Sequence, residues 1–275
     1  MTTWRPIRTF DRARLAAARL QAHHATQWLA RTARAYVPAR PDDSHTSLGW
    51  DDAFGGLTSH PLPDGAQLGL RLADLTLALF NADASAPHDT FSLDGRCDPE
   101  ACTWLMGHAG MRNLDPRALD APLPYMLDEK PDGGAYRVDA EALGTLAAWF
   151  SNADAALCAV RERIAARGLA APPVRCWPHH FDLDTLVTVA PGRTSGIGFA
   201  PGDAYYDEPY FYVSVYPAPE IAALPALPTI GHWHTKQFTA AVATASRIHA
   251  AQDQSSAVQE FLRVAVDATI KALRS

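Results

Sequence analysis

The chain has 275 residues, close to the largest size at which a single hydrophobic core is usual. Hydrophobic residues make up 48% and the net charge is −6, which indicates a globular protein and argues against nucleic acid as its main partner. No apolar run is long enough to span a bilayer, so we expect a cytoplasmic protein without a membrane partner. The sequence is also compatible with a homo-oligomer.

The first forty residues are basic, with eight arginines against a single acid, Asp11. Such a segment is typical of transit peptides and of helices that lie on a membrane surface. Because it continues without a cleavage-like boundary, we interpret residues 12–37 as a surface helix of the fold. Its apolar positions predict burial through Leu15, Trp28 and Leu29, and Pro38 ends it.

The four cysteines are Cys97, Cys102, Cys158 and Cys176. No pair has the two-residue gap of a zinc or redox motif. Four cysteines in a chain of this length do not make a disulfide framework, so we expect reduced thiols.

In chain order, the first half predicts strands followed by a short helix. We expect strands at residues 44–50, 65–80 and 90–93, the second because apolar and polar residues alternate along it. Asp98 and Pro99 predict the start of a helix that runs to about residue 107. Residues 113–135 are rich in Pro, Gly and Asp, and we expect a long loop there.

The second half repeats this order of helix, strands and helix. Asp139 predicts the cap of a helix over 140–167, and Pro172–Pro173 breaks the chain after it. We expect strands at 174–189, 196–200, 210–216 and 232–235, then helices at 238–248 and 256–273.

Strand follows strand in each half, which predicts antiparallel pairing and an α+β fold. We expect one compact unit over 1–275. Two diverged halves, 1–112 and 136–275, joined by the loop 113–135, are the alternative.

The stretch from Arg175 to Asp182 is the densest in chemically active side chains, with an arginine, a thiol, two histidines and a carboxylate. Read as one strand, it places Trp177 and His179 on one face and His180 and Asp182 on the other. The second face is therefore the candidate for a functional site.

Two later strands supply more polar side chains. Alternation places Glu208, Tyr210 and Tyr212 on one face, and it places His232 and His234 together on another.

If these faces line one cavity, the side chains support either of two chemistries. His180, Asp182, His232 and His234 would suffice to hold a divalent transition metal. Without metal, Asp182 and Glu208 would be proton carriers in an enzyme that acts on a small molecule, and Tyr210 would position the substrate.

The opposing interpretation is a non-catalytic ligand-binding or assembly protein with structural histidines. No HExxH motif is present, and no GxSxG motif supports a serine hydrolase. The glycine-rich residues 192–198 lack the ending of a phosphate-binding loop and predict a hairpin turn. Both interpretations are compatible with the sequence.

Several segments resemble a family of bacterial proteins known only as a domain of unknown function. The resemblance rests on residues 173–183, 198–202, 208–212 and 216–217, on Leu20, His23 and Gln27, and on the closing residues 258–272. It covers nearly the whole chain but implies no activity. It does imply that Asp182 and Glu208 belong to a shared framework, whereas His179 and His180 are particular to a subgroup.

Overall fold

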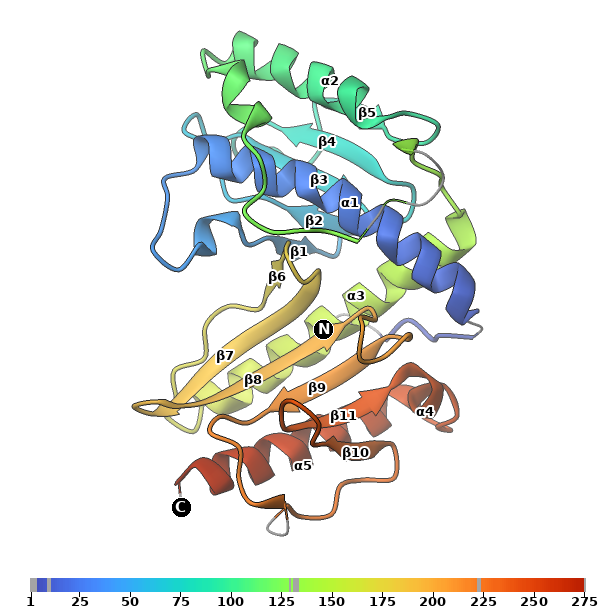
Figure 1. The fold of residues 1–275 in the computed structure, drawn as a ribbon, viewed down its shortest axis with the longest axis vertical. Helices are drawn as coiled ribbons and strands as arrows, with labels where there is room; N and C mark the ends of the chain where they lie inside the picture. Colours follow the sequence, from blue (N-terminus) through green and yellow to red (C-terminus); the bar gives the residue numbers. More distant parts are fainter. Residues whose placement is uncertain (1–3, 9–10, 129, 131–133, 222–223, 275) are drawn as a thin grey trace. The chain divides into compact units, whose positions relative to one another are not determined.

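The computed structural model describes residues 4–8, 11–128, 130, 134–221 and 224–274, and it divides into two compact units (Figure 1). We call Phe10–Ala147 with Cys176–Phe181 the N-terminal unit. We call Met1–Thr9, Ala148–Arg175 and Asp182–Ser275 the C-terminal unit. One sheet has five strands and the other has six, and every strand pairing that the structure describes is antiparallel. The predicted α+β fold is confirmed.

The N-terminal unit is built on a meander of five strands in sequence order. Its elements are α1 (Arg12–Tyr36), the 3-10 turn η1 (Ser44–Thr46), β1 (Gly49–Asp51), β2 (Gly56–Thr58), β3 (Gln67–Arg71), β4 (Thr76–Phe80), β5 (Asp89–Ser92), α2 (Asp98–Met111) and η2 (Pro116–Asp120). Asp11 caps α1 by accepting from two backbone N–H groups. Leu15, Trp28 and Leu29 are buried, as the helical spacing predicts.

Three expectations for the N-terminal unit are corrected in detail. The single strand expected over 65–80 is the hairpin of β3 and β4, because Leu75 adopts a positive φ of 49° and Arg71 pairs with Asp74 across the turn at 2.6 Å. The strand expected over 44–50 begins only at Gly49, after η1. Helix α2 starts one residue earlier than expected, since Cys97 occupies the cap position.

The C-terminal unit is built on the larger sheet, whose strand order is β10-β11-β9-β8-β7-β6. The remaining elements of the chain are α3 (Ala140–Ala165), β6 (Arg175–Trp177), β7 (Asp182–Ala190), β8 (Arg193–Ala200), β9 (Tyr210–Ser214), β10 (Gly231–His234), β11 (Ala240–Thr244), α4 (Ala245–His249) and α5 (Gln254–Arg274). The start of α3, up to Ala147, and residues 176–177 of β6 fall in the N-terminal unit. β7, β8 and β9 pair antiparallel, as the short links between them predict. The turn that joins β7 to β8 lies at residues 191–192, with Gly192 at a φ of 70°, so the hairpin turn expected over residues 192–198 is wrong beyond Gly192, because residues 193–198 belong to β8.

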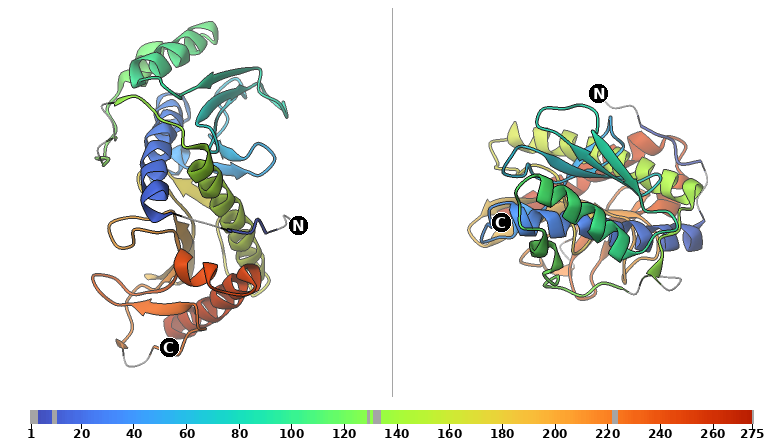
Figure 2. Two further views of the ribbon diagram at one scale, coloured as in Figure 1. Left: turned by 90° about the vertical axis from the view of Figure 1, so that its right-hand side faces the viewer. Right: turned by 90° about the horizontal axis from the view of Figure 1, so that it is seen from above.

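One face of this sheet carries the core of the C-terminal unit. Phe199 and Phe211 are fully buried, and the ring of Phe199 packs on Trp149 and Phe150 of α3. The buried side of helix α5 packs against β7, β8, β9 and β11 (Figures 1 and 2). The opposite face carries a second buried cluster of Ala200, Tyr210, Ala240 and Val242, against which Tyr206 and Tyr212 pack.

The helix expected over 238–248 is wrong for its first half. Residues 240–244 form β11, which lies between β9 and β10 and is buried along its whole length. Alanine favours helices, but a strand paired on both sides and packed on both faces accepts small side chains, and this environment overrides the local propensity. Only α4 is helical there.

The strand expected over 174–189 is also wrong in its middle. β6 ends at Trp177, and a turn precedes β7, with Phe181 at a positive φ of 60°. Pro178 has no N–H for a sheet ladder, and the N–H groups of His180 and Phe181 bond back to the carbonyl of Trp177. The alternation assumed for His179 and His180 therefore does not apply.

Helix α3 is long and apolar enough to cross a membrane by composition. Of that stretch, 56% is buried inside the structure, and the core helices of globular proteins meet the same criterion. The helix therefore carries no membrane assignment.

Candidate functional site

A row of tyrosines lies on the face of the larger sheet that is opposite to α5. The antiparallel register aligns Asp184, Gly198, Tyr212, Val242 and His232 across five neighbouring strands. Residues directly opposite in a ladder share a face, so Tyr212 and His232 point to the same side. We define the tyrosine face by seven residues: Asp182, Asp203, Tyr206, Tyr210, Tyr212, His232 and His234.

Asp182 begins β7 and is only 8% exposed. Its Oδ2 accepts a hydrogen bond of 2.7 Å from the Tyr212 hydroxyl, and its Oδ1 is buried without a hydrogen-bond partner. Burial, with a further contribution from the charge of Asp203, raises the pKa of Asp182 to about 6. The carboxyl group is thus held at one oxygen and unsatisfied at the other.

Asp203 fixes the loop between β8 and β9. Its Oδ1 accepts from the backbone N–H groups of Tyr205 and Tyr206, and its Oδ2 accepts from the Tyr210 hydroxyl at 2.5 Å. Gly202 precedes it at a φ of 112°, a conformation that favours glycine. Together these bonds hold Tyr206 over the sheet, with ring centroids 4.8 Å apart from Tyr210.

The tyrosine hydroxyls stay protonated over the ordinary pH range. Burial, followed by the hydrogen bond to Asp203, raises the pKa of Tyr210. Burial and the neighbouring acid Asp182 raise the pKa of Tyr212 well above its ordinary value. Each phenol is therefore a fixed hydrogen-bond donor toward a carboxylate.

Tyr206 joins the two histidines of β10. Its hydroxyl lies 3.0 Å from His232 Nε2 and 3.0 Å from His234 Nδ1. The Lys236 carbonyl lies 2.6 Å from His234 Nε2 and only accepts, so this nitrogen carries the proton and Nδ1 of a neutral His234 ring has a lone pair.

The Lys236 carbonyl therefore decides which group donates and which accepts in each hydrogen bond of this set. The Tyr206 hydroxyl donates to His234 Nδ1 and accepts from His232 Nε2–H. His232 Nδ1 is then left as an acceptor, and it is buried without a hydrogen-bond partner. Burial and the positive charge of Arg247 lower the pKa of His232, which keeps the ring neutral near pH 7.

We expect Tyr206→Phe to release His232 from this single tautomer, while the Lys236 carbonyl still holds His234. The wild-type rings should both show protonated Nε2 and bare Nδ1 nitrogens, because one hydroxyl links them to the Lys236 carbonyl. Two-bond ¹H–¹⁵N correlation spectra of the imidazoles measure this state directly. In the variant the His232 ring should exchange between tautomers, and an unchanged His232 spectrum would contradict the assignment.

Sequence reasoning missed Asp203 and Tyr206 as members of this group. Both lie in a loop, where strand alternation gives no information. The available signal was the Gly202–Asp203 pair followed by two tyrosines, since aspartate commonly accepts from backbone N–H groups two and three residues later.

Glu208 has a different environment from the one expected for a proton carrier. Its Oε2 accepts from the backbone N–H and from the hydroxyl of Ser246, both at 2.6 Å. These bonds tie residue 208 to the first turn of α4, which is the environment of a structural carboxylate.

His180 belongs to the N-terminal unit and lies exposed on the turn before β7. Its ring is 4.2 Å from that of His179. The turn is anchored at the carbonyl of Pro178, which accepts from Gln27 Nε2 and His23 Nε2, each at 2.8 Å. A site that includes both His180 and Asp182 stays a prediction.

The structure does not gather the remaining predicted metal ligands. His232 and His234 lie on β10, and Asp182 lies on β7, four strand spacings away. At about 4.8 Å for each spacing this is roughly 19 Å, far beyond the reach of one ion. Among the described residues, no group of three or more His, Cys, Asp or Glu side chains could hold a metal ion.

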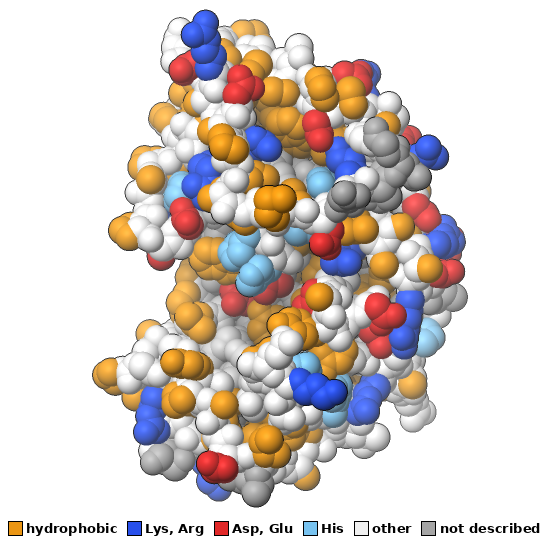
Figure 3. Space-filling view, in the orientation of Figure 1, with side chains coloured by type: hydrophobic (Ala, Val, Ile, Leu, Met, Phe, Trp, Pro, Cys, Tyr) orange, Lys and Arg blue, Asp and Glu red, His pale blue; other side chains and the backbone are white. Residues whose placement is uncertain are grey.

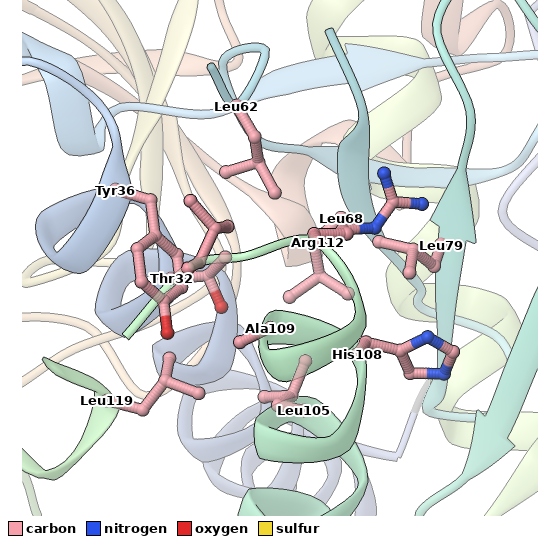
Figure 4. A pocket seen from close by; sticks show the side chains of 11 residues that line it. Thr32, Tyr36, Leu62, Leu68, Leu79, Leu105, His108, Ala109, Arg112 and Leu119 are labelled. Atoms are coloured by element: carbon pink, nitrogen blue, oxygen red, sulfur yellow. The ribbon is translucent and has the colours of Figure 1, made fainter. Parts of the chain in front are cut away.

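Neither of two hollows elsewhere offers a better site. In the N-terminal unit, leucines, Ala109 and four polar side chains line a partly open hollow of about 20 Å³ (Figure 4), with room for about one water molecule. Its polar side chains bond elsewhere, for example Tyr36 to the Asp115 carbonyl and His108 to Asp89. A more open depression of the C-terminal unit is lined by Arg247, Glu260, three alanines and residues 228–230, and by none of the predicted site residues.

Comparison with known proteins gives a partial match. A model described as "Family of unknown function (DUF5996)" matches residues 191–274, from the β7–β8 turn to the last residues of α5. This agrees with the expected resemblance to a domain of unknown function over that part of the chain. No curated protein and no solved structure matches.

Proposed function

We propose that the chain is an enzyme that binds a small organic molecule on the tyrosine face and exchanges a proton with it through Asp182. The single observation that carries this proposal is the state of the Asp182 carboxyl group. It is buried, held by Tyr212 at one oxygen, and without a hydrogen-bond partner at the other.

A carboxyl group with a pKa of about 6 is suited to general acid–base catalysis. Such a group transfers protons well when its pKa is close to the working pH, and burial is the usual means of raising a carboxyl pKa. An unsatisfied buried oxygen costs roughly 1–3 kcal/mol, so its presence supports a bound molecule that completes it.

The neighbouring hydroxyls support a positioning role. Tyr210 and Tyr212 are held by carboxylates at 2.5 Å and 2.7 Å, so their rings have fixed orientations. A small molecule fits the charge distribution better than nucleic acid, because acidic and basic side chains are interspersed over the face seen in Figure 3.

A non-catalytic binding protein is the second candidate. The observation that favours it is the histidine pair, which Tyr206 and the Lys236 carbonyl hold in fixed bonds. Histidines in this state orient other groups and need not take part in chemistry. Under this reading Asp182 would bind a ligand without exchanging a proton.

The direct test is a titration of Asp182 in the full chain without added ligand. Aspartate labelled with ¹³C at the carboxyl carbon gives one signal for each residue, and Asp182→Asn identifies the signal that belongs to Asp182. We expect a midpoint near 6, because burial opposes ionisation. A midpoint near 4, as for an exposed aspartate, would contradict the proposal.

A further inference from the structure

We infer that the molecule bound on the tyrosine face is an organic ammonium ion, with its charged nitrogen at Asp182. This inference rests on the proposed function and adds the class of substrate. It follows from three features of the face: the sign of its charges, the kind of atom left without a partner, and the row of aromatic rings.

The charges that act on this face near Asp182 are negative. Asp203 acts on Asp182, while Asp182 and Asp184 act on Tyr212. The opposing positive charge, that of Arg247, acts at the far end of the row, on Tyr206 and His232. A cation placed at Asp182 therefore gains attraction from several acids, whereas an anion would be repelled by them.

The buried atoms without partners on this face are both acceptors when Asp182 is ionised. They are Asp182 Oδ1 and, in the tautomer that the Lys236 carbonyl imposes, His232 Nδ1. An ammonium group at Asp182 has three N–H donors and no acceptor, so it satisfies Oδ1 without adding an unsatisfied acceptor; His232 Nδ1 lies four strands away and is not reached by the same group. A carboxylate ligand would bring only acceptors to a site whose own acceptor, Asp182 Oδ1, already lacks a donor.

The aromatic rings favour the same class of ligand. Tyr206, Tyr210 and Tyr212 form a continuous row, with ring centroids 4.8 Å and 6.0 Å apart. The faces of tyrosine rings attract cations, and their edges accommodate an apolar body. A row that begins beside a buried carboxylate thus fits an amine with a hydrocarbon part.

Three probes of one shape test the inference on the full chain at pH 7.5: benzylamine, benzyl alcohol and benzoate. We expect benzylamine to shift the Asp182 carboxyl signal and to bind at least ten times more tightly than the other two. Because the cation binds the carboxylate form, it should also lower the titration midpoint of Asp182. A tenfold preference for the carboxylate over the carboxylic acid lowers that midpoint by about one pH unit.

The matched control is Asp267→Asn, which makes the same charge change on α5, the helix that packs on the opposite face. Asp182→Asn should abolish the preference for benzylamine, and Asp267→Asn should retain it. Equal affinity for the three probes, tighter binding of benzoate, or no binding of benzylamine would overturn the inference.

The two proposals fail separately in this design. A ligand-free midpoint near 6 without a preference for the amine would overturn the ammonium class and leave Asp182 as a proton carrier. A midpoint near 4 with a clear preference for the amine would overturn the proton carrier and leave an ammonium-binding site.

Discussion

Replacing Asp182 by asparagine should abolish most of the fall in the free energy of unfolding that the wild-type chain shows between pH 4 and pH 6. In the folded chain the pKa of Asp182 is about 6, against an ordinary value of 3.8. Between these two values the folded state keeps a proton that the unfolded state has released, so the free energy of unfolding falls as the pH rises. The expected fall is about 3 kcal/mol, from ~1.4 kcal/mol for each pH unit.

Urea unfolding at pH 4, 5, 6, 7 and 8 measures this effect. The asparagine amide keeps an oxygen for the Tyr212 hydroxyl but does not ionise, so the variant should have a flatter pH dependence than the wild type. Asp267→Asn makes the same charge change but removes a carboxylate that pairs with Arg167 and Arg263, so as a control it should keep the wild-type fall between pH 4 and pH 6. Parallel curves for Asp182→Asn and the wild type would show that Asp182 ionises normally.

Much of the fold can be predicted from the sequence where local pattern and packing agree. α1 and α5 carry apolar residues at helical spacing, and both are buried along that side. In β9, Phe211 and Val213 face the core that packs on α3 and α5, and Tyr210 and Tyr212 face the other side of the sheet, where Tyr210 joins a second buried cluster. The pattern is decisive there because one face of the strand is fully buried.

Prediction fails where distant parts of the chain decide the local structure. Residues 240–244 have the composition of a helix and become a central strand, because β9 and β10 pair with them on both sides. The turn at residues 178–181 interrupts a run that reads as one strand, since Pro178 and the left-handed Phe181 together end the ladder.

In the candidate site, too, local pattern predicts some features, and distant parts of the chain decide the others. Alternation places His232 and His234 on one face, and their common bond to Tyr206 is consistent with that placement. It could not show that Asp182 lies four strands away, because the order of strands in a sheet follows from long-range pairing. Nor could it give Asp203 its role, which depends on loop bonds to Tyr205, Tyr206 and Tyr210.

A second large effect is expected at Gly198, where Tyr212 lies across the sheet. A Cβ atom added there would lie 2.5 Å from both Cζ and Oη of Tyr212 and 2.7 Å from the carbonyl oxygen of Leu183. That carbonyl belongs to the paired strand β7 and cannot retreat, so the tyrosine ring has to move. We expect Gly198→Ala to break the bond between Tyr212 and Asp182.

The expected cost of Gly198→Ala is roughly 2–4 kcal/mol, from overpacking and from the lost hydrogen bond together. The bond from Tyr212 lowers the pKa of Asp182, so its loss should also move the titration midpoint of Asp182 to a value above that of the wild type. Urea unfolding measures the first effect, and the ¹³C carboxyl signal of Asp182 measures the second.

Gly196→Ala is the matched control, two residues earlier on the same face of β8. Its added Cβ would meet the Ser214 hydroxyl at 2.8 Å, a small group that can rotate away, and would not come close to the hydroxyl that binds Asp182. We therefore expect a smaller loss of stability and an unchanged midpoint for Asp182. Equal shifts of the midpoint in both variants would show that the effect comes from disturbed packing along β8. The hydrogen bond from Tyr212 would then not be what sets the pKa of Asp182.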